Sequence, residues 1–263
     1  MAEMIYFCIS LKSRKNATDW DAVCALLSNT IDSIKNSTSK NYHIVIAGHE
    51  KPQFIEGDDA VTFVEAPFAP PGANTKGRGN DKHKKRRLAA AWVKSQGNHT
   101  NRLGYIDADD LIDKTLVEKV LSSGGDVSVI VNSGYKLDMR NGDMEFISKR
   151  FSRYCGSCFF PVFTNEELPS SWDDVNTVFS QFDKHREFDI QCKALGKKVK
   201  SVQSDDAGFV VYLVNHTDSL EFSKKGMKND TVDNGPQAEV KQRVLETRFG
   251  LLDFHALFEE SNG

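Results

Sequence analysis

The sequence of 263 residues predicts an α/β fold in which a mixed, mainly parallel sheet is flanked by helices. Within the first fifty residues, an apolar run, a helical pattern and a second apolar run follow one another, which is the order of a strand–helix–strand unit. Hydrophobic residues make up 39% and charged residues 27% of the chain, as in globular proteins rather than disordered chains. No apolar run approaches the ~20 residues of a membrane-spanning helix.

The amino-terminal elements follow from apolar periodicity and turn residues. Residues 5–10 form a strand-length apolar run, and Thr18 or Asp19 can then cap a helix over residues 20–34, where apolar residues recur at helical spacing. Residues 42–47 are a second apolar run that ends at a glycine. The other elements expected in this half are a strand at 60–65, a long Pro/Gly-rich loop at 66–80, a helix at 81–95 and a strand at 103–106.

The carboxyl-terminal half shows the same alternation of strand-length and helical patterns, with no internal repeat. Residues 144–163 alternate enough to suggest a hairpin region. The other elements expected here are a helix at 115–121, a strand at 127–131, a helix at 187–195, strands at 199–202 and 209–214, and a helix at 238–258.

Charge is spread unevenly along the chain. The net charge is −3, yet residues 76–87 hold seven Lys or Arg and one acid, Asp81. A local basic cluster on an acidic protein fits a site for one small anion better than a general nucleic-acid surface, so no nucleic-acid partner is expected.

The sharpest motif is an acidic cluster, Asp107, Asp109 and Asp110, directly after the strand expected at 103–106. Open α/β sheets bind ligands outside the carboxyl ends of their strands. Carboxylates so close together repel one another unless a cation compensates them, and Mg²⁺ or Mn²⁺ binds carboxylates together with substrate phosphates. The cluster therefore favours metal-assisted handling of a phosphate or diphosphate, although a solvated turn that caps the next helix is the alternative.

In this order of elements, the motif Tyr-Ile-Asp-Ala-Asp-Asp-Leu resembles that of the GT-A fold glycosyltransferases, especially those of glycosyltransferase family 2. The resemblance covers residues 5 to about 216 and implies a Rossmann-like nucleotide-diphospho-sugar transferase fold. Asp107 and Asp109 match the DxD motif, which in that family binds Mn²⁺ or Mg²⁺ and the donor diphosphate, and Asp110 matches a frequent extra acid. His216, in a His-x-x-Ser setting after a strand, matches a further metal ligand.

The resemblance implies a single GT-A-like domain over residues 1–263. Its nucleotide-sugar-binding half is residues 1–110, its acceptor half 111–220 and a helical extension 221–263. Relatives end the second strand with Asp-Asp-Gly-Ser, whereas here it ends Ala-Gly-His-Glu at Glu50. The expected donor-binding residues are Asp81, Lys82, Arg86, Arg87, Asp107 and Glu50. The cations would neutralise the leaving diphosphate, while some of this basic helix face is simply solvated.

Inverting members of the family carry an acidic general base, often in Glu-Asp, at the start of a later helix. Here the pair is not adjacent, since Glu187 and Asp189 are two residues apart and His185 stands close by. Residues two apart point in different directions on a helix, so only one of them is expected to face the site. We expect Glu187 as the base, with Asp189 and His185 as alternatives; all three could instead cap this helix.

The implied function is metal-dependent transfer of a sugar, as by a hexosyltransferase, from a UDP- or GDP-linked donor to a glycan or lipid-linked acceptor, with inversion. One alternative is a haloacid dehalogenase-type phosphohydrolase, in which Asn132-Ser133, Lys193 and Asp205-Asp206 would imitate the later motifs. Another is a catalytically silent GT-A-like binding module. The pair Cys155 and Cys158 lacks the partners of a zinc site, which favours a packing role.

The expected location is the cytoplasm or the inner face of a membrane as a peripheral protein. The start of the chain lacks a signal-peptide pattern, and five cysteines, an odd number, suit a reducing compartment. The helix expected at 238–258 could cover the core, mediate a homodimer or contact a membrane, and its charges of both signs disfavour an anionic membrane.

Overall fold

The computed structural model of the protein describes residues 3–72, 75–182, 184–216, 218 and 238–251. Most of the extension expected at 221–263 lies outside these residues. Among the described helices, none is both long and apolar enough to cross a lipid bilayer.

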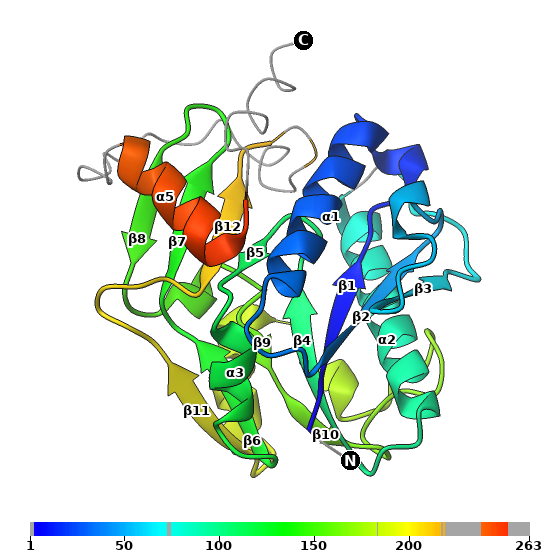
Figure 1. Cartoon of the computed structure of the whole chain (residues 1–263). Helices are drawn as coiled ribbons and strands as arrows, with labels where there is room; N and C mark the ends of the chain where they lie inside the picture. The colour runs from blue at the N-terminus through cyan, green and yellow to red at the C-terminus, as the bar shows by residue number, and fades with distance from the viewer. Residues whose placement is uncertain (1–2, 73–74, 183, 217, 219–237, 252–263) are drawn as a thin grey trace.

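Within the described residues, the larger of two sheets has eight strands and is mainly parallel (Figure 1). Its path is β11-β6-β9-β4-β1-β2-β3, and β10 pairs with β4 off this path. The pairs β1–β2, β1–β4, β2–β3 and β6–β11 are parallel, while β9 and β10 run antiparallel to their neighbours. The strands are β1 (Ile5–Ser10), β2 (Tyr42–Gly48), β3 (Val61–Glu65), β4 (Thr100–Ile106), β6 (Val127–Val131), β9 (Phe159–Phe160), β10 (Val162–Thr164) and β11 (Lys198–Val202). The predicted fold class is confirmed.

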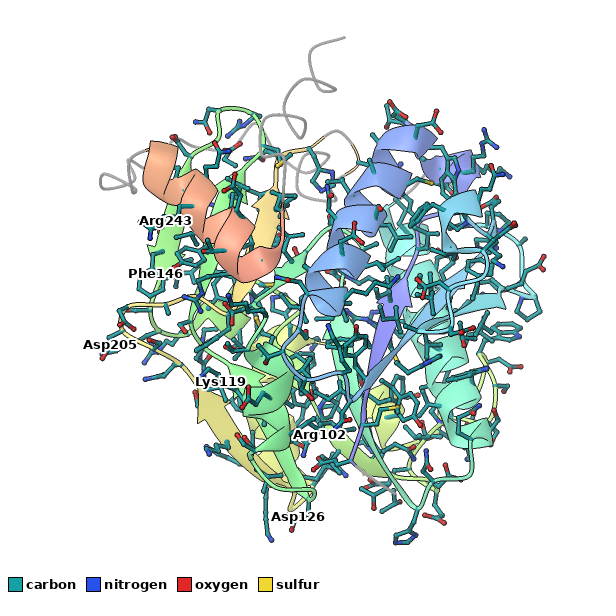
Figure 2. All side chains as sticks on the ribbon, in the orientation of Figure 1. Arg102, Lys119, Asp126, Phe146, Asp205 and Arg243 are labelled. Carbon is teal, nitrogen blue, oxygen red and sulfur yellow. The ribbon has the colours of Figure 1, made fainter. Side chains whose placement is uncertain are left out.

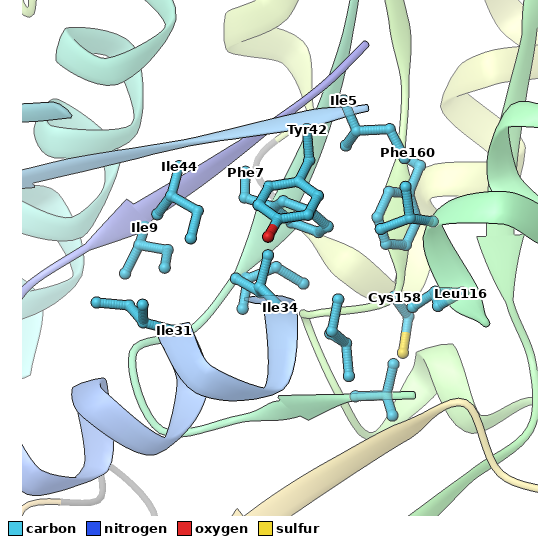
Figure 3. Close-up of a cluster of buried hydrophobic side chains, with 14 of the residues drawn as sticks. Ile5, Phe7, Ile9, Ile31, Ile34, Tyr42, Ile44, Leu116, Cys158 and Phe160 are labelled. Carbon is cyan, nitrogen blue, oxygen red and sulfur yellow. The ribbon is translucent and has the colours of Figure 1, made fainter. Parts of the chain in front are cut away.

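Helices cover both faces of this sheet because its central strands are apolar on both sides. Along β1, Ile5, Phe7 and Ile9 face one way and Tyr6 and Cys8 the other. The first face packs against α1 (Trp20–Lys35) and α3 (Leu116–Leu121), and Figure 3 shows its side chains. The second face packs against α2 (Thr75–Ser95) and α4 (Phe188–Ala194). Each layer buries its own apolar cluster.

A second, four-stranded sheet was not predicted as a separate unit. Its order is β5 (Leu111–Ile112), β12 (Val210–Val214), β7 (Gly134–Asp138) and β8 (Met144–Ile147). Helix α5 (Ala238–Phe249) covers it, and Leu245 and Phe249 of α5 pack on Tyr135, Leu137 and Leu213 (Figure 1). The helix expected at 238–258 therefore does cover a core over its described part.

Several predicted boundaries differ from the structure; for example, the strand expected at 103–106 already begins at Thr100. Helix α2 begins at Thr75, so the loop expected at 66–80 is shorter, because Gly77 and Gly79 do not stop the helix. The hairpin expected at 144–163 does not form as one unit. Its first part is β8, which pairs with β7, and a 3₁₀ turn, Phe151–Arg153, then leads to the strands β9 and β10. The helix expected at 187–195 begins one residue later, after a 3₁₀ turn, His185–Glu187.

A buried arginine fixes the amino end of β4. Arg102 is 2% exposed and donates to a Glu3 carboxylate oxygen at 2.7 Å and to the carbonyl oxygens of Val127 and Gly124 at 2.7 and 2.6 Å (Figure 2). These bonds hold β4 against the start of β6, because a buried cation left without partners would be costly. The acidic cluster follows the opposite, carboxyl end of the same strand.

Candidate functional site

A cavity of about 490 Å³ opens at the carboxyl ends of β1 and β4. Its walls come from the segment after β1, the face of α2, the acidic cluster after β4, the turn at 185–186 and the segment after β12. Seven of the predicted site residues line it: Asp81, Lys82, Arg86, Asp107, Asp109, His185 and His216. Glu50, Arg87, Glu187 and Asp189 are not among its lining residues.

The acidic cluster brings three carboxylates together, since one oxygen from each of Asp107, Asp109 and Asp110 lies within 4.8 Å of the others. Asp110 is fully buried, and its carboxylate accepts hydrogen bonds from the Ser157 hydroxyl and, at 3.3 Å, from the Leu213 N–H. Burial raises the pKa of Asp110, and the neighbouring acids raise it further. Asp110 therefore anchors the turn, while Asp107 and Asp109 face the cavity.

Ser157 joins two members of this cluster. Its hydroxyl oxygen accepts from the Asp107 N–H at 2.8 Å while the hydroxyl donates to Asp110. The Cys155 Sγ lies 3.3 Å from the Asp110 carboxylate, and Cys155 and Cys158 are both buried free thiols. This segment thus shapes the turn by packing and hydrogen bonding, in line with the packing role expected for the two cysteines.

Two cations of α2 neutralise Asp107. Lys82 Nζ is 2.7 Å from the carboxylate, and Arg86 Nη2 is 3.3 Å from Oδ1. Burial would raise the pKa of Asp107, but the charges of Lys82 and Arg86 outweigh it and hold that pKa at about 2. The Arg86 guanidinium, 8% exposed, also lies over the Tyr105 ring at 5.1 Å. Asp107 is therefore ionised at neutral pH.

The helical period explains which basic residues of α2 reach the cavity. At 100° per residue, Asp81, Lys82, Lys85 and Arg86 fall on one face, while Lys84 and Arg87 fall opposite. Accordingly, Lys84 Nζ lies over the Trp172 ring at 4.9 Å, and Arg87 Nε donates to the Trp172 carbonyl at 2.7 Å. Arg87 thus points away from the expected donor site.

Asp81, which lines the cavity, is held by two partners. His49 Nε2 is 3.1 Å from Asp81 Oδ1, and Lys85 Nζ is 2.6 Å from Oδ2. Lys85, 1% exposed, also donates to the Leu11 carbonyl at 2.8 Å, and burial lowers its pKa. Glu50, in contrast, accepts from the Arg14 N–H at 3.0 Å. Glu50 therefore holds the turn after β1.

His216 lies beside the acidic cluster. Its Nε2 is 2.8 Å from Asp109 Oδ2, while Nδ1 is buried with no hydrogen-bond partner in the described part of the chain. Two residues on, the Asp218 carboxylate accepts from Lys12 Nζ at 2.6 Å and from the Thr18 N–H at 2.9 Å. This contact brings the segment after β12 onto the segment after β1. Sequence reasoning missed Lys12 and Asp218, although Lys12 follows the first parallel strand, where ligands are expected.

The three candidates for the base occupy different places. His185 lines the cavity, and its Nε2 lies 3.2 Å from the Arg153 carbonyl oxygen. Because a carbonyl only accepts, Nε2 carries the hydrogen and Nδ1 keeps a lone pair. Burial lowers the pKa of His185 below its ordinary value of 6.5, so the imidazole is neutral at pH 7. The Glu187 carboxylate lies 3.5 Å from Lys184 Nζ, and Asp189 lines a neighbouring cavity.

The donor set fits a hard divalent cation. Asp107 and Asp109 supply carboxylate oxygens, which Mg²⁺ and Mn²⁺ prefer, and the His216 imidazole beside Asp109 is acceptable to Mn²⁺. The buried, unpartnered Nδ1 of His216 shows that the hydrogen bonding of this ring is incomplete within the described residues. Asp110 fits less well, because its carboxylate is already occupied by Ser157 and Leu213.

No protein-family model and no curated protein sequence matches this chain. Similar solved structures include a proposed nucleotide-diphospho-sugar transferase from Desulfovibrio desulfuricans G20, at 11% identity and a TM-score of 0.40, covering 98% of this chain and 96% of that one. The glycosyltransferase GlyE of Streptococcus pneumoniae TIGR4 has 8% identity and a TM-score of 0.41, covering 98% of this chain and 63% of GlyE. The bifunctional IspDF of Campylobacter jejuni has 12% identity and a TM-score of 0.38, covering 78% of this chain.

This chain spans 50% of the IspDF chain. The three structures named here are thus one proposed nucleotide-diphospho-sugar transferase, one glycosyltransferase and IspDF.

Proposed function

We propose that the protein is a metal-dependent glycosyltransferase that moves a sugar from a UDP- or GDP-linked donor to a glycan or lipid-linked acceptor, with inversion. The observation that carries the proposal is the juxtaposition, in one cavity of about 490 Å³, of the carboxylates of Asp107 and Asp109 with the cations Lys82 and Arg86. The volume lies in the range of small-molecule sites, and its place at the strand ends suits a nucleotide.

Different residues of the cavity would bind the metal ion, the diphosphate and the nucleoside of the donor. Asp107, Asp109 and His216 would hold Mn²⁺ or Mg²⁺, which would neutralise the diphosphate as it leaves. Lys82 and Arg86 would contribute positive charge to the same oxygens, Arg86 as a bidentate donor. Asp81, which also lines the cavity, would accept a hydrogen bond from the nucleoside. Without these cations, the two carboxylates would repel the diphosphate.

His185 is the candidate base that the geometry supports best, because it lines the cavity while Glu187 and Asp189 do not. In the proposed reaction, the acceptor hydroxyl oxygen bonds to the anomeric carbon and the bond from that carbon to the diphosphate oxygen breaks. The hydroxyl proton passes to Nδ1 of the neutral His185 imidazole.

The metal assignment is tested with Asp109→Ala. We expect this variant to stay folded and to lose Mn²⁺-dependent binding of UDP or GDP, measured by calorimetry, because it removes one of two facing carboxylates. Glu118→Ala, on the exposed side of α3, changes charge equally and should bind as the wild type. Unchanged binding in Asp109→Ala would overturn the assignment.

The base is tested by comparing His185→Gln with Glu187→Gln in a transfer assay. We expect His185→Gln to keep donor affinity and to lower kcat by about 10²–10⁴-fold, while Glu187→Gln stays near the wild type. The reverse order would return the role to Glu187.

The phosphohydrolase alternative gains no support from the geometry. Lys193, Asp205 and Ser133 are not among the residues that line the cavity. Asp205 is exposed at the outer edge of the molecule (Figure 2). The residues that would imitate the later motifs of that class therefore do not meet Asp107.

A further inference from the structure

A second cavity, of about 250 Å³, adjoins the first and is rich in cations. Arg150, Arg153 and Arg186 line it, together with one acid, Asp189. His185, also in its wall, is neutral at pH 7, since burial lowers its pKa. Three arginines and a single acid therefore line one concave site, and this charge balance favours an anion.

These guanidinium groups are available to a ligand. In the part of the chain that the structure describes, the side chains of Arg150 and Arg153 make no hydrogen bond or ion pair, and Arg186 uses only Nε, which donates to the Arg153 carbonyl at 3.2 Å. Arg150 also has a left-handed backbone, with φ 59°, which is unfavourable for a residue with a Cβ. Such conformations concentrate at functional sites.

A shared backbone contact joins the two turns that carry Arg153 and Arg186. The Arg153 carbonyl oxygen accepts from both His185 Nε2 and Arg186 Nε, each at 3.2 Å. It thereby ties the 3₁₀ turn Phe151–Arg153 to the turn His185–Glu187, which come from distant parts of the sequence. The contact fixes the backbone of the two turns relative to each other, so the ordering of these turns is not an additional entropic cost when a ligand binds.

The two cavities meet at the proposed base. His185 and Arg186 line both of them, and Tyr154, next to Arg153, lines the larger one with 56% of its surface exposed. An exposed aromatic ring offers an apolar face on which a sugar ring can pack, with a polar hydroxyl at its tip. A ligand that spans the border would thus place a hydroxyl near His185 and a charged group among the arginines.

We propose that the second cavity binds an anionic group of the acceptor, a carboxylate or a phosphate, so that the acceptor is an acidic sugar which packs on Tyr154. The identification of this ligand as the acceptor rests on the proposed function, whereas the anion site itself follows from the arginines. Bidentate arginine contacts suit both anions, so the chemistry they share is a pair of oxygens that carry negative charge.

The test is a titration of three probes, glucuronate, glucose 6-phosphate and glucose, into the wild type and the double variant Arg150→Gln/Arg153→Gln. Neither of the two arginines lines the larger cavity. We expect the wild type to bind at least one anionic probe at least about tenfold more tightly than glucose, and the variant to lose that difference. Which probe binds distinguishes a carboxylate from a phosphate.

The matched control is Lys51→Gln/Lys149→Gln, which removes the same charge from exposed positions outside both cavities. Equal loss in the control, or wild-type affinity in the arginine variant, would overturn the proposal. Titration of UDP and GDP with Mn²⁺ separates the two hypotheses. If the wild type binds neither nucleotide, the proposed function fails, while arginine-dependent binding of an anionic sugar would still establish the anion site.

Discussion

The contact between Lys82 and Asp107 predicts that one substitution changes two affinities in opposite directions. Lys82 Nζ lies 2.7 Å from the Asp107 carboxylate, and its side chain is 30% exposed. At this distance, two unit charges attract by about 1.5 kcal/mol at the dielectric constant of water, and by more in a partly buried site. A metal ion must compete with this attraction for the carboxylate. Lys82→Gln should therefore bind Mn²⁺ alone about tenfold more tightly.

The same lysine should help a diphosphate. Since Lys82 would contact its oxygens, Lys82→Gln should bind UDP in the presence of Mn²⁺ about tenfold more weakly. Calorimetry measures both affinities. The control is Lys84→Gln on the same helix, because Lys84 lies over Phe68 and Trp172 instead of facing the cavity. The reasoning is refuted if the two affinities of Lys82→Gln change in the same direction, or if Lys84→Gln reproduces both changes.

Two further predictions concern stability. Phe249→Ala should lower the free energy of unfolding, measured in urea, by about 3–5 kcal/mol, because Phe249 is 1% exposed and packs between α5 and the second sheet. The control is Arg243→Gln at an exposed position of the same helix, which should change the free energy of unfolding little (Figure 2). A loss below about 1 kcal/mol in Phe249→Ala would contradict the packing. Burial lowers the pKa of His43 in the folded protein below the ordinary value of 6.5, so the unfolded chain binds more protons and stability should decline as the pH falls below about 6.5. His43→Gln should make that decline shallower. An unchanged pH dependence of stability in this variant would contradict the prediction.

The sequence predicts the parts of the site that follow from local rules. Asp107 and Asp109 come directly after a buried parallel strand, and such strand ends gather at one edge of the sheet. The helical period of 100° separates Lys82 and Arg86 from Arg87, so helix geometry alone divides the basic run into residues of two different faces. The strand–helix–strand order similarly predicts a mainly parallel sheet.

Long-range pairings are the parts that local rules do not reach. Lys12 and Asp218 are joined across 206 positions, and Ser157 reaches the acidic cluster from 47 positions beyond Asp110. Apolar periodicity identifies the residues of β12 as a strand, but it does not indicate that this strand pairs with β7 in the second sheet instead of joining the large sheet. Helix position favours Glu187 as the base, with Asp189 and His185 as alternatives, but it does not indicate that a 3₁₀ turn places His185 at the cavity.

The central claim is that the cavity binds a nucleoside diphosphate through a divalent metal. Calorimetric titration of UDP and GDP into the wild-type protein, each with and without Mn²⁺, tests it most directly. We predict micromolar binding of one nucleotide that is lost when the metal is withheld, because Lys82 and Arg86 are then engaged by Asp107 and the charge of Asp109 is left without a metal ion to offset it. Binding of neither nucleotide, or binding that does not depend on the metal, would contradict the claim.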